Sequence, residues 1–326
     1  MSARAFRLPS HVRPLSYHID LSTDPSRVEF SGTVTIELEI TSQTEAIVLH
    51  SRHLEVTRAE VSAMFGETDS ALVSYQPEQE TVTLLLERAR ALLVFSGRLA
   101  PSMHGLYLGA DGVHSAVCSQ CEATDARAIF PCFDEPAFKA GLRWTLRTGP
   151  GVTALSNGVL QNQFSSHGEQ VFEFAETKPV SSYLAAVVVG DFEAEQADYV
   201  RDVPLKVYAP SGKGKQTHFA KGFTSRVLPW FEEYFDFPFP FGKYDQVAVP
   251  GFDAGAMENI GLVLFRQNLL LMEPGSASWR QEKVIALVIA HEMAHMWFGN
   301  VVTMRWWDDL WLNEAFAEWM AHKACH

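Results

Sequence analysis

The sequence is poor in cysteine. Only four cysteines occur in 326 residues, and only Cys118 and Cys121 are closely spaced, as a C-x-x-C pair. No second pair follows at the spacing of a zinc ribbon, and no strand-to-helix context for thioredoxin chemistry is evident. A redox motif or a zinc knuckle stays open, but free, buried or reduced thiols are the favoured interpretation.

Positive charge and long hydrophobic runs are also scarce. Lys and Arg number 26 against 39 Asp and Glu, which gives a formal net charge of −13. This balance argues against nucleic acid or an anionic membrane as the main partner. The longest aliphatic run, Val284–Ala290, is far too short to span a bilayer, and the N-terminal residues lack the apolar core of a secretion signal. We therefore predict a cytoplasmic protein, and its oligomeric state is left open.

The length suggests about two domains. Residues 14–100 predict antiparallel sheets with one solvated face, because apolar residues alternate or cluster between turn residues. The expected strands include Tyr17–Ser22, Val34–Ile40, Ala46–His50 and Val82–Glu87. We predict an α+β fold, with an antiparallel β-rich domain of sandwich or saddle form over residues 1–195 and a second domain over residues 196–326. The charged segment Glu193–Asp202 marks the boundary.

Aromatic residues recur at helical spacing between residues 215 and 235. They are Phe219, Phe223, Trp230, Phe231 and Tyr234. This spacing indicates a helix whose aromatic face packs in the core rather than forming a binding stripe.

The central motif is His291-Glu292-Met293-Ala294-His295. In a helix, residues four apart differ by only about 40° in direction, so His291 and His295 point the same way and can reach one metal ion. Glu292, beside the first histidine, stands where the general base for a metal-bound water belongs. The alternative is a chance H-E-x-x-H on a core helix.

The surrounding residues predict the helix that carries this motif, from Ala277 to Phe298. Ser278 and Gln281 have the form of a capping box at its start, and Gly299 is a natural stop.

Two histidines leave a tetrahedral metal short of a protein ligand. Glu314, separated from His295 by eighteen residues, is the third candidate. Asn313 is expected to cap a second helix, with Glu314 in its first turn. Glu318, one turn on, could accept a hydrogen bond from the far nitrogen of a ligand histidine. A solvated helix glutamate is an equally good interpretation of Glu318.

The loop Gly255-Ala256-Met257-Glu258-Asn259 lies upstream of this helix. Here the sequence resembles the M1 family of zinc aminopeptidases, the aminopeptidase N type of gluzincin, which carries G-A-M-E-N, then H-E-x-x-H, then eighteen residues and a Glu. The resemblance also covers Gln120–Arg127, Phe130–Pro136, Lys243–Asp245 and Trp306–Glu314. It implies a thermolysin-like catalytic domain, one zinc ion per chain on His291, His295 and Glu314, and peptide substrates with a free N-terminus.

The resemblance makes Glu258 the anchor for the substrate's α-ammonium group, with Glu122 and Gln120 as its partners. A desolvated cation needs fixed counter-charge. Gly255 and Ala256 have little or no side chain, so a substrate backbone could approach this loop as an added strand. Without the resemblance, Glu258 and Glu122 would be interpreted as ordinary surface carboxylates.

The sequence departs from the family pattern after Glu314. Catalytic domains of the family continue into a helical subdomain, which carries a tyrosine that hydrogen-bonds the oxyanion of the tetrahedral intermediate. Only twelve residues follow Glu314 here, and the last tyrosine is Tyr244. We therefore expect the N-terminal portion of a longer enzyme, with a truncated catalytic domain. Loss of one oxyanion donor typically lowers the rate by a factor of ~10² to 10³.

Three functions follow as hypotheses. The first is a zinc aminopeptidase with Glu292 as general base. The second is the leukotriene A4 hydrolase branch of the family, which typically has Gly-Gly-Met-Glu-Asn, so Ala256 points away from it. The third is a catalytically silent fragment that binds zinc and peptide but lacks the oxyanion tyrosine.

Overall fold

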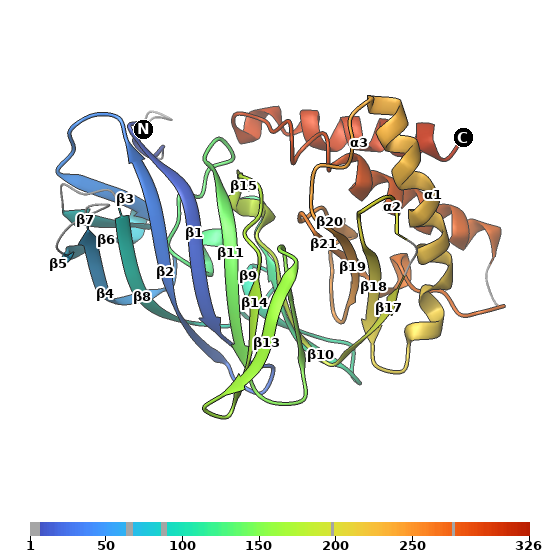
Figure 1. The fold of residues 1–326 in the computed structure, drawn as a ribbon, viewed down its shortest axis with the longest axis horizontal. Helices are drawn as coiled ribbons and strands as arrows, with labels where there is room; N and C mark the ends of the chain where they lie inside the picture. The colour runs from blue at the N-terminus through green and yellow to red at the C-terminus, as the bar shows by residue number, and fades with distance from the viewer. Residues whose placement is uncertain (1–6, 63–67, 86–89, 197–198, 276–277) are drawn as a thin grey trace. The chain divides into compact units, whose positions relative to one another are not determined.

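The computed structural model describes residues 7–62, 68–85, 90–196, 199–275 and 278–326 (Figure 1). The chain forms two compact units that interleave along the sequence. The first comprises Met1–Tyr107, Ser119–Pro150 and Leu160–Ala185, and the second comprises Leu108–Cys118, Gly151–Val159 and Ala186–His326. No single cut in the sequence separates these units, and the domain boundary after residue 195 stays a prediction.

The first unit is built on a nine-stranded sheet. Its strands are β1 (Val12–Ser22), β2 (Glu29–Ile40), β4 (Glu55–Ser62), β5 (Thr68–Ser70), β8 (Arg90–Arg98), β11 (Lys139–Thr148), β13 (Leu160–Ser166), β14 (Glu169–Phe174) and β15 (Val180–Ser181). The order is β13-β14-β11-β1-β2-β8-β4-β5, with β15 paired to β11. Figure 1 shows the long strands β11, β1, β2 and β8 side by side.

A second sheet of the first unit has the order β3-β7-β6. Its strands are β3 (Ala46–His50), β6 (Leu72–Gln76) and β7 (Thr81–Leu85). β3 has the predicted bounds. The predicted strand Val82–Glu87 corresponds to β7, and its last two residues lie outside the described residues.

Buried and solvent-facing residues alternate along the long strands of the large sheet, as predicted. β1 and β2 pair antiparallel, and their inward residues, such as Ile19 and Val34, are fully buried. One exception to the antiparallel prediction is the pairing of β1 with β11, which is parallel, with Tyr17 opposite Leu142. Parallel neighbours require a long connection, and more than a hundred residues separate these two strands.

The second unit contains a mixed five-stranded sheet with the order β17-β18-β19-β21-β20. Its strands are β17 (Phe192–Gln196), β18 (Leu205–Pro210), β19 (Tyr244–Val249), β20 (Ala256–Met257) and β21 (Leu262–Arg266). The β18–β19 and β19–β21 pairs are parallel. Helix α1 (His218–Phe235) connects β18 to β19, as a crossover between parallel strands requires. Every residue of β19 is buried, which is typical of a parallel strand covered on both faces.

The four-stranded sheet β12-β16-β10-β9 completes the β structure. It contains β9 (Gly105–Ala110), β10 (Ser115–Gln120), β12 (Thr153–Ser156) and β16 (Val187–Gly190). The remaining helices are α2 (Trp279–Ala294) and α3 (Trp311–Ala324). Short 3-10 turns occupy Pro77–Gln79, Ala126–Ala128, Ser182–Leu184, Gly214–Thr217, Gln267–Leu269 and Trp307–Asp309. These elements confirm the α+β class. Within the described residues, no helix is long and apolar enough to cross a membrane.

The prediction that the aromatic residues of α1 form core packing was wrong for most of them. The buried residues of α1 are Ala220, Thr224, Val227, Leu228, Phe231 and Glu232, and Phe231 is the member of the predicted aromatic set among them. The other aromatic residues stack on each other, with ring centroids 6.1 Å apart for Phe219 and Phe223 and 5.2 Å apart for Trp230 and Tyr234.

Helix α2 packs against both α1 and α3. Aromatic rings fill the space where the three elements meet: Phe231 lies 5.8 Å from Trp297, and Phe298 lies 3.9 Å from Phe316, measured between ring centroids. Rigid aromatic contacts of this kind hold the end of α2 against the start of α3.

Candidate metal centre

The end of α2 carries the two histidines. Ser278 caps the start of this helix, because its hydroxyl accepts a hydrogen bond from the Gln281 N–H, as predicted. The predicted residue Ala277 lies outside the described residues. His291 is in the last turn and His295 is the C-cap residue, and their Nε2 atoms are 3.0 Å apart.

The helix ends four residues before the predicted end at Phe298. After Ala294 the chain tightens, because the Met296 N–H donates to the Met293 carbonyl and the Trp297 N–H to the Ala294 carbonyl. These bonds span three residues instead of four. The tighter turn leads the chain to Gly299, whose φ of +130° is open only to glycine.

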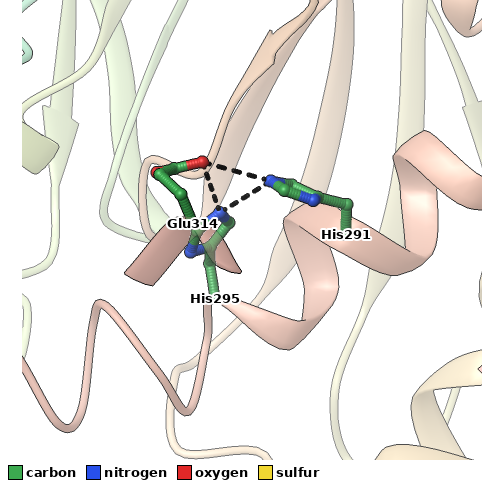
Figure 2. Close-up of side chains that lie close together, drawn as sticks. All are labelled: His291, His295 and Glu314. Atoms are coloured by element: carbon green, nitrogen blue, oxygen red, sulfur yellow. Dashed lines mark hydrogen bonds and ion pairs between the residues drawn. The ribbon is translucent and has the colours of Figure 1, made fainter. Parts of the chain in front are cut away.

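Glu314 lies beside the histidine pair, in the first turn of α3 (Figure 2). Its Oε2 atom is 3.4 Å from Nε2 of His291 and 3.8 Å from Nε2 of His295. The predicted cap of this helix was wrong: Leu310 is the N-cap residue, and Asn313 is buried inside the helix. The 3-10 turn that ends at Asp309 runs directly into α3, so helical hydrogen bonds already begin at the Leu310 carbonyl.

The Nδ1 atoms of both histidines face hydrogen-bond acceptors. Nδ1 of His295 lies 3.1 Å from the Phe298 carbonyl oxygen, and Nδ1 of His291 lies 3.2 Å from Oε2 of Glu318. A carbonyl oxygen can only accept, so the proton of neutral His295 resides on Nδ1. Its Nε2 lone pair then faces His291 and Glu314.

Burial and charge separate the pKa values of the three groups. Burial, together with the charge of the neighbouring His291, lowers the pKa of His295 to about 4. Burial also works against protonation of His291, but the hydrogen bond and charge of Glu314 outweigh it and raise the pKa of His291. Burial would raise the pKa of Glu314, but the hydrogen bond from His291 and the charges of both imidazoles lower it. His295 is therefore neutral and Glu314 ionised at neutral pH.

The three groups form one donor set that fits a divalent cation. One ligand atom from each of His291, His295 and Glu314 can be chosen so that all lie within 4.8 Å of one another. Two imidazole nitrogens and one carboxylate oxygen are the ligands of catalytic zinc sites that keep a further position open.

Two buried carboxylates adjoin this set. Glu292 is 5% exposed and Glu258 is 3% exposed. Oxygen atoms of both lie within 4.8 Å of each other and of a ring nitrogen of His295. Burial, together with the charge of Glu314, raises the pKa of Glu258 to about 7. Glu258 is therefore buried, and the alternative interpretation that made it a surface carboxylate was wrong.

The loop Gly255–Asn259 lies at the end of the five-stranded sheet. Ala256 and Met257 form β20, which pairs antiparallel with β21 and stands last in the strand order. Met257, Glu258 and Asn259 are buried, whereas Gly255 is exposed and Ala256 half-buried. The small residues therefore present accessible backbone at the outer strand of the sheet.

Gln120 and Glu122 belong to the first unit. Gln120 ends β10 and is buried, and Glu122 follows it in the next loop and is half-buried. Their predicted role as partners of Glu258 stays a prediction.

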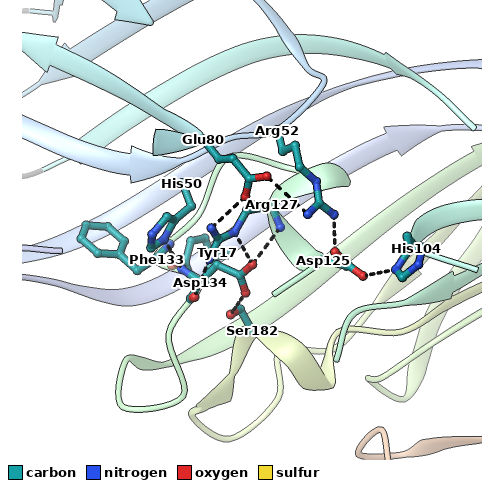
Figure 3. A network of polar contacts seen from close by, with 10 residues as sticks. All are labelled: Tyr17, His50, Arg52, Glu80, His104, Asp125, Arg127, Phe133, Asp134 and Ser182. Carbon is teal, nitrogen blue, oxygen red and sulfur yellow. Dashed lines mark hydrogen bonds and ion pairs between the residues drawn. The ribbon is translucent and has the colours of Figure 1, made fainter. Parts of the chain in front are cut away.

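A network of polar contacts involves Asp125 and Arg127, which follow Glu122 in the chain (Figure 3). Asp125 pairs with Arg52 and, at 2.7 Å, with Nδ1 of His104. Arg127 donates from Nε to Asp134 over 2.9 Å and from Nη1 to Glu80 over 3.1 Å. Ser182 also donates to Asp134. Three of these residues, Asp125, Arg127 and Asp134, lie in motifs that carried the resemblance, and the structure gives them a part in this network.

The two cysteines of the C-x-x-C pair form no disulfide, and Sγ of Cys118 donates to the Ala116 carbonyl over 3.6 Å. All four cysteines are free, and Cys118, Cys121 and Cys132 are buried. Burial raises the pKa of all three thiols. Free buried thiols were the favoured interpretation, and such thiols are chemically inert.

Comparison with known proteins agrees with this arrangement. The Peptidase M1 N-terminal domain matches residues 13–184, and the Peptidase family M1 domain matches residues 219–326. The puromycin-sensitive aminopeptidase of Caenorhabditis elegans is 36% identical over 97% of this chain and 35% of its own length. Endoplasmic reticulum aminopeptidase 1 of Homo sapiens is 36% identical over 96% of this chain and 35% of its own length.

A bacterial relative matches over most of its own length. Aminopeptidase N of Acetobacter pasteurianus is 36% identical over 97% of this chain and 91% of its own length. The chain thus spans about a third of the length of the two animal relatives and nearly all of the bacterial one. By its two domain matches and these relatives, the chain belongs to peptidase family M1.

Proposed function

We propose that this protein is a zinc metallo-aminopeptidase, which removes N-terminal residues from peptides. The observation that carries the proposal is the convergence of His291, His295 and Glu314 on one position, with the buried carboxylate of Glu292 nearby. The family membership and the aminopeptidase names of the relatives support the same reaction.

His291, His295 and Glu314 would hold one zinc ion. When bound, zinc supplies Lewis-acid polarisation of the substrate carbonyl and lowers the pKa of a water molecule towards about 7. The Phe298 carbonyl and Glu318 hold the two imidazole rings by their Nδ1 atoms, so that both Nε2 atoms stay turned towards Glu314.

Glu292 is the proposed general base. It follows His291 on α2, and its carboxylate would lie beside the proposed ligands instead of among them. It takes the proton of the attacking water and passes it to the leaving amine. Burial excludes competing water from this carboxylate, which favours transfer to the substrate.

Glu258 is the proposed anchor of the free amino group. A buried carboxylate gives an ammonium group the counter-charge that it needs on leaving water. The outer edge of β20 can receive the substrate backbone as an added strand, which would bring the first peptide bond to the metal. By the family resemblance, Gln120 and Glu122 would assist in this recognition.

The substitution Glu292→Gln tests the proposal in zinc-loaded protein. We expect the release of the amine from an aminoacyl-anilide to fall by a factor of ~10² to 10⁴, with zinc content unchanged. A chelator should abolish release by the unsubstituted protein. The matched control is Glu282→Gln, at the start of the same helix and away from the metal centre, which should keep full activity.

Other outcomes would select other functions. Zinc binding without chelator-sensitive release would favour the catalytically silent zinc- and peptide-binding function, and hydrolysis of an epoxide would favour the leukotriene A4 hydrolase branch. Loss of zinc in Glu292→Gln would contradict the role of Glu292. The cytoplasmic location and the absence of nucleic-acid and membrane partners stay predictions.

A further inference from the structure

The segment that carries Glu258 is held by further hydrogen bonds besides the β20–β21 pairing, and two of these contacts lie at its start and at Glu258. At its start, the Arg266 N–H donates to the Gly255 carbonyl over 3.0 Å, and the Arg266 side chain donates to the carbonyls of Phe252, Asp253 and Ala254. The second contact is with the backbone of Glu258 itself, which is the residue proposed to bind the substrate's amino group.

Asn300 makes this second contact. Its side-chain Nδ2 donates to the Glu258 carbonyl oxygen over 2.9 Å, and it also lies 3.5 Å from Sδ of Met296. Because the Glu258 carbonyl can only accept, the side-chain atom facing it is the amide nitrogen. Asn300 is 1% exposed, so water does not compete for this bond.

The backbone of Asn300 is tied to the metal centre. Its N–H donates to the His295 carbonyl oxygen over 3.0 Å. One residue therefore connects the backbone of a proposed metal ligand with the backbone of the proposed amine anchor. A ring nitrogen of His295 and a carboxylate oxygen of Glu258 lie within 4.8 Å of each other.

Gly299 makes this connection possible. Its φ of +130° turns the chain sharply after the end of α2, and a Cβ atom there would stand 3.2 Å from Nδ1 of His295. Only glycine adopts this conformation readily, so the turn brings Asn300 back beneath the helix end. The turn also lets the Gly299 N–H donate to the Val302 carbonyl over 2.8 Å.

We propose that Asn300 is a positioning residue, which sets the separation between the metal centre and the amine anchor Glu258. The inference rests on the proposed function. An aminopeptidase cleaves one residue from the amino end, so the distance from anchor to metal decides which peptide bond is cut. A misplacement of about 1 Å in such a site can lower activity by a factor of roughly 10².

A pair of zinc-directed probes tests this role in full-length, zinc-loaded protein. One is an amino-acid hydroxamate with a free α-amino group, and the other is the same hydroxamate with the amino group acetylated. Both bind through the hydroxamate, but only the free amine uses Glu258. The variants are Asn300→Leu, which removes the donor, and Asn300→Asp, which keeps the shape and replaces the amide N–H groups with an acceptor.

We expect both variants to bind the free-amine hydroxamate roughly 10 to 100 times more weakly, with unchanged affinity for the acetylated probe and unchanged zinc content. For anilide substrates, KM should rise more than kcat falls. The control Thr217→Val removes another buried side-chain bond to a carbonyl of the second unit, from Thr217 to Gly214, and should leave both affinities unchanged.

Equal weakening of both probes, or loss of zinc, would overturn the proposal, because Asn300 would then support the metal centre or the fold alone. Where Asn300→Leu does not fold, Asn300→Asp carries the test. If the unsubstituted protein binds both probes equally, the anchor role of Glu258 fails. If it prefers the free amine and the variants keep that preference, only the role of Asn300 fails.

Discussion

The carboxylate of Glu318 lies 3.2 Å from Nδ1 of His291, on the far side of the ring from the nitrogen that faces Glu314. Glu318 is on the same helix as Glu314, one turn later. A single helix therefore supplies both a proposed ligand and the group that orients another ligand. Glu318 also pairs with His322 at 3.1 Å, which restrains its carboxylate from the other side.

The substitution Glu318→Ala should lower zinc affinity by a factor of about 10 to 100, because carboxylates that orient ligand histidines typically contribute this much. The affinity can be measured by competition with a chromogenic chelator. Glu318→Gln keeps an oxygen acceptor, so its zinc affinity should lie between that of Glu318→Ala and that of the unsubstituted protein. Unchanged zinc affinity in Glu318→Ala would leave Glu318 as a solvated helix glutamate, as its side-chain exposure of 62% also allows.

Metal removal should destabilise the second unit. A ligand at a thousandfold excess over its Kd stabilises the folded state by about 4 kcal/mol. Thermal unfolding followed with and without chelator measures this contribution, and added zinc should restore it. In His295→Ala, which lacks one proposed ligand, zinc and chelator should have little effect on Tm. A zinc-dependent Tm shift of full size in that variant would mean that the metal binds elsewhere.

The substitution Glu258→Ala should weaken the binding of free-amine peptides by roughly a factor of 10 to 100, because a hydrogen bond to a charged group contributes about 1.5–3 kcal/mol. Peptides with an acetylated N-terminus should bind as before. Inhibition of anilide hydrolysis by both peptide series measures the difference. Equal loss for both series would remove the anchor role.

Acid should destabilise the first unit through Asp24. Burial alone would raise the pKa of this carboxyl, but hydrogen bonds from Ser26, Gly149 and Thr148 lower it to about 2. The unfolded chain has the ordinary value of about 3.9, so the folded state binds the proton less readily. The stabilisation is therefore complete above pH 4 and is lost as the pH falls towards 2.

The variant Asp24→Asn checks this dependence. At pH 6 it should be less stable than the unsubstituted protein by about 1–3 kcal/mol in urea unfolding, and the gap should close towards pH 2. Thr148→Val, which removes only one uncharged donor to Asp24, should show a smaller gap. A gap of constant size from pH 6 to pH 2 would contradict the assignment.

The sequence predicted those parts of the site that depend on local rules. The Ser278 cap and the spacing of His291 and His295 act within one or two helical turns, where geometry is regular. The start of α3 was less predictable. Asparagine is a common N-cap residue, which is why Asn313 was predicted as the cap. The preceding 3-10 turn instead starts the helix at Leu310, and this start depends on how the loop packs.

Sequence patterns did not predict contacts between residues that are distant in the chain. The parallel pairing of β1 with β11 joins strands that are distant in the chain, and neither strand carries a signal for its partner. Asn300 was missed for a similar reason. Its signal was the Gly299-Asn300 pair just after the metal helix, but a turn residue gives no indication that its side chain contacts Glu258.

The interleaving of the two units has a consequence for synthesis on the ribosome. Residues 108–118 of the second unit emerge between the first segment of the first unit and its two later segments, yet β10 pairs with Val188–Gly190 of β16, which is translated some seventy residues later. The edge of β10 that pairs with β16 therefore has no partner in the nascent chain until β16 has been translated, whereas β9 on its other side is already present. The first unit cannot be complete until its last segment, which ends at Ala185, has been translated, and the four-stranded sheet that contains β10 also needs β16.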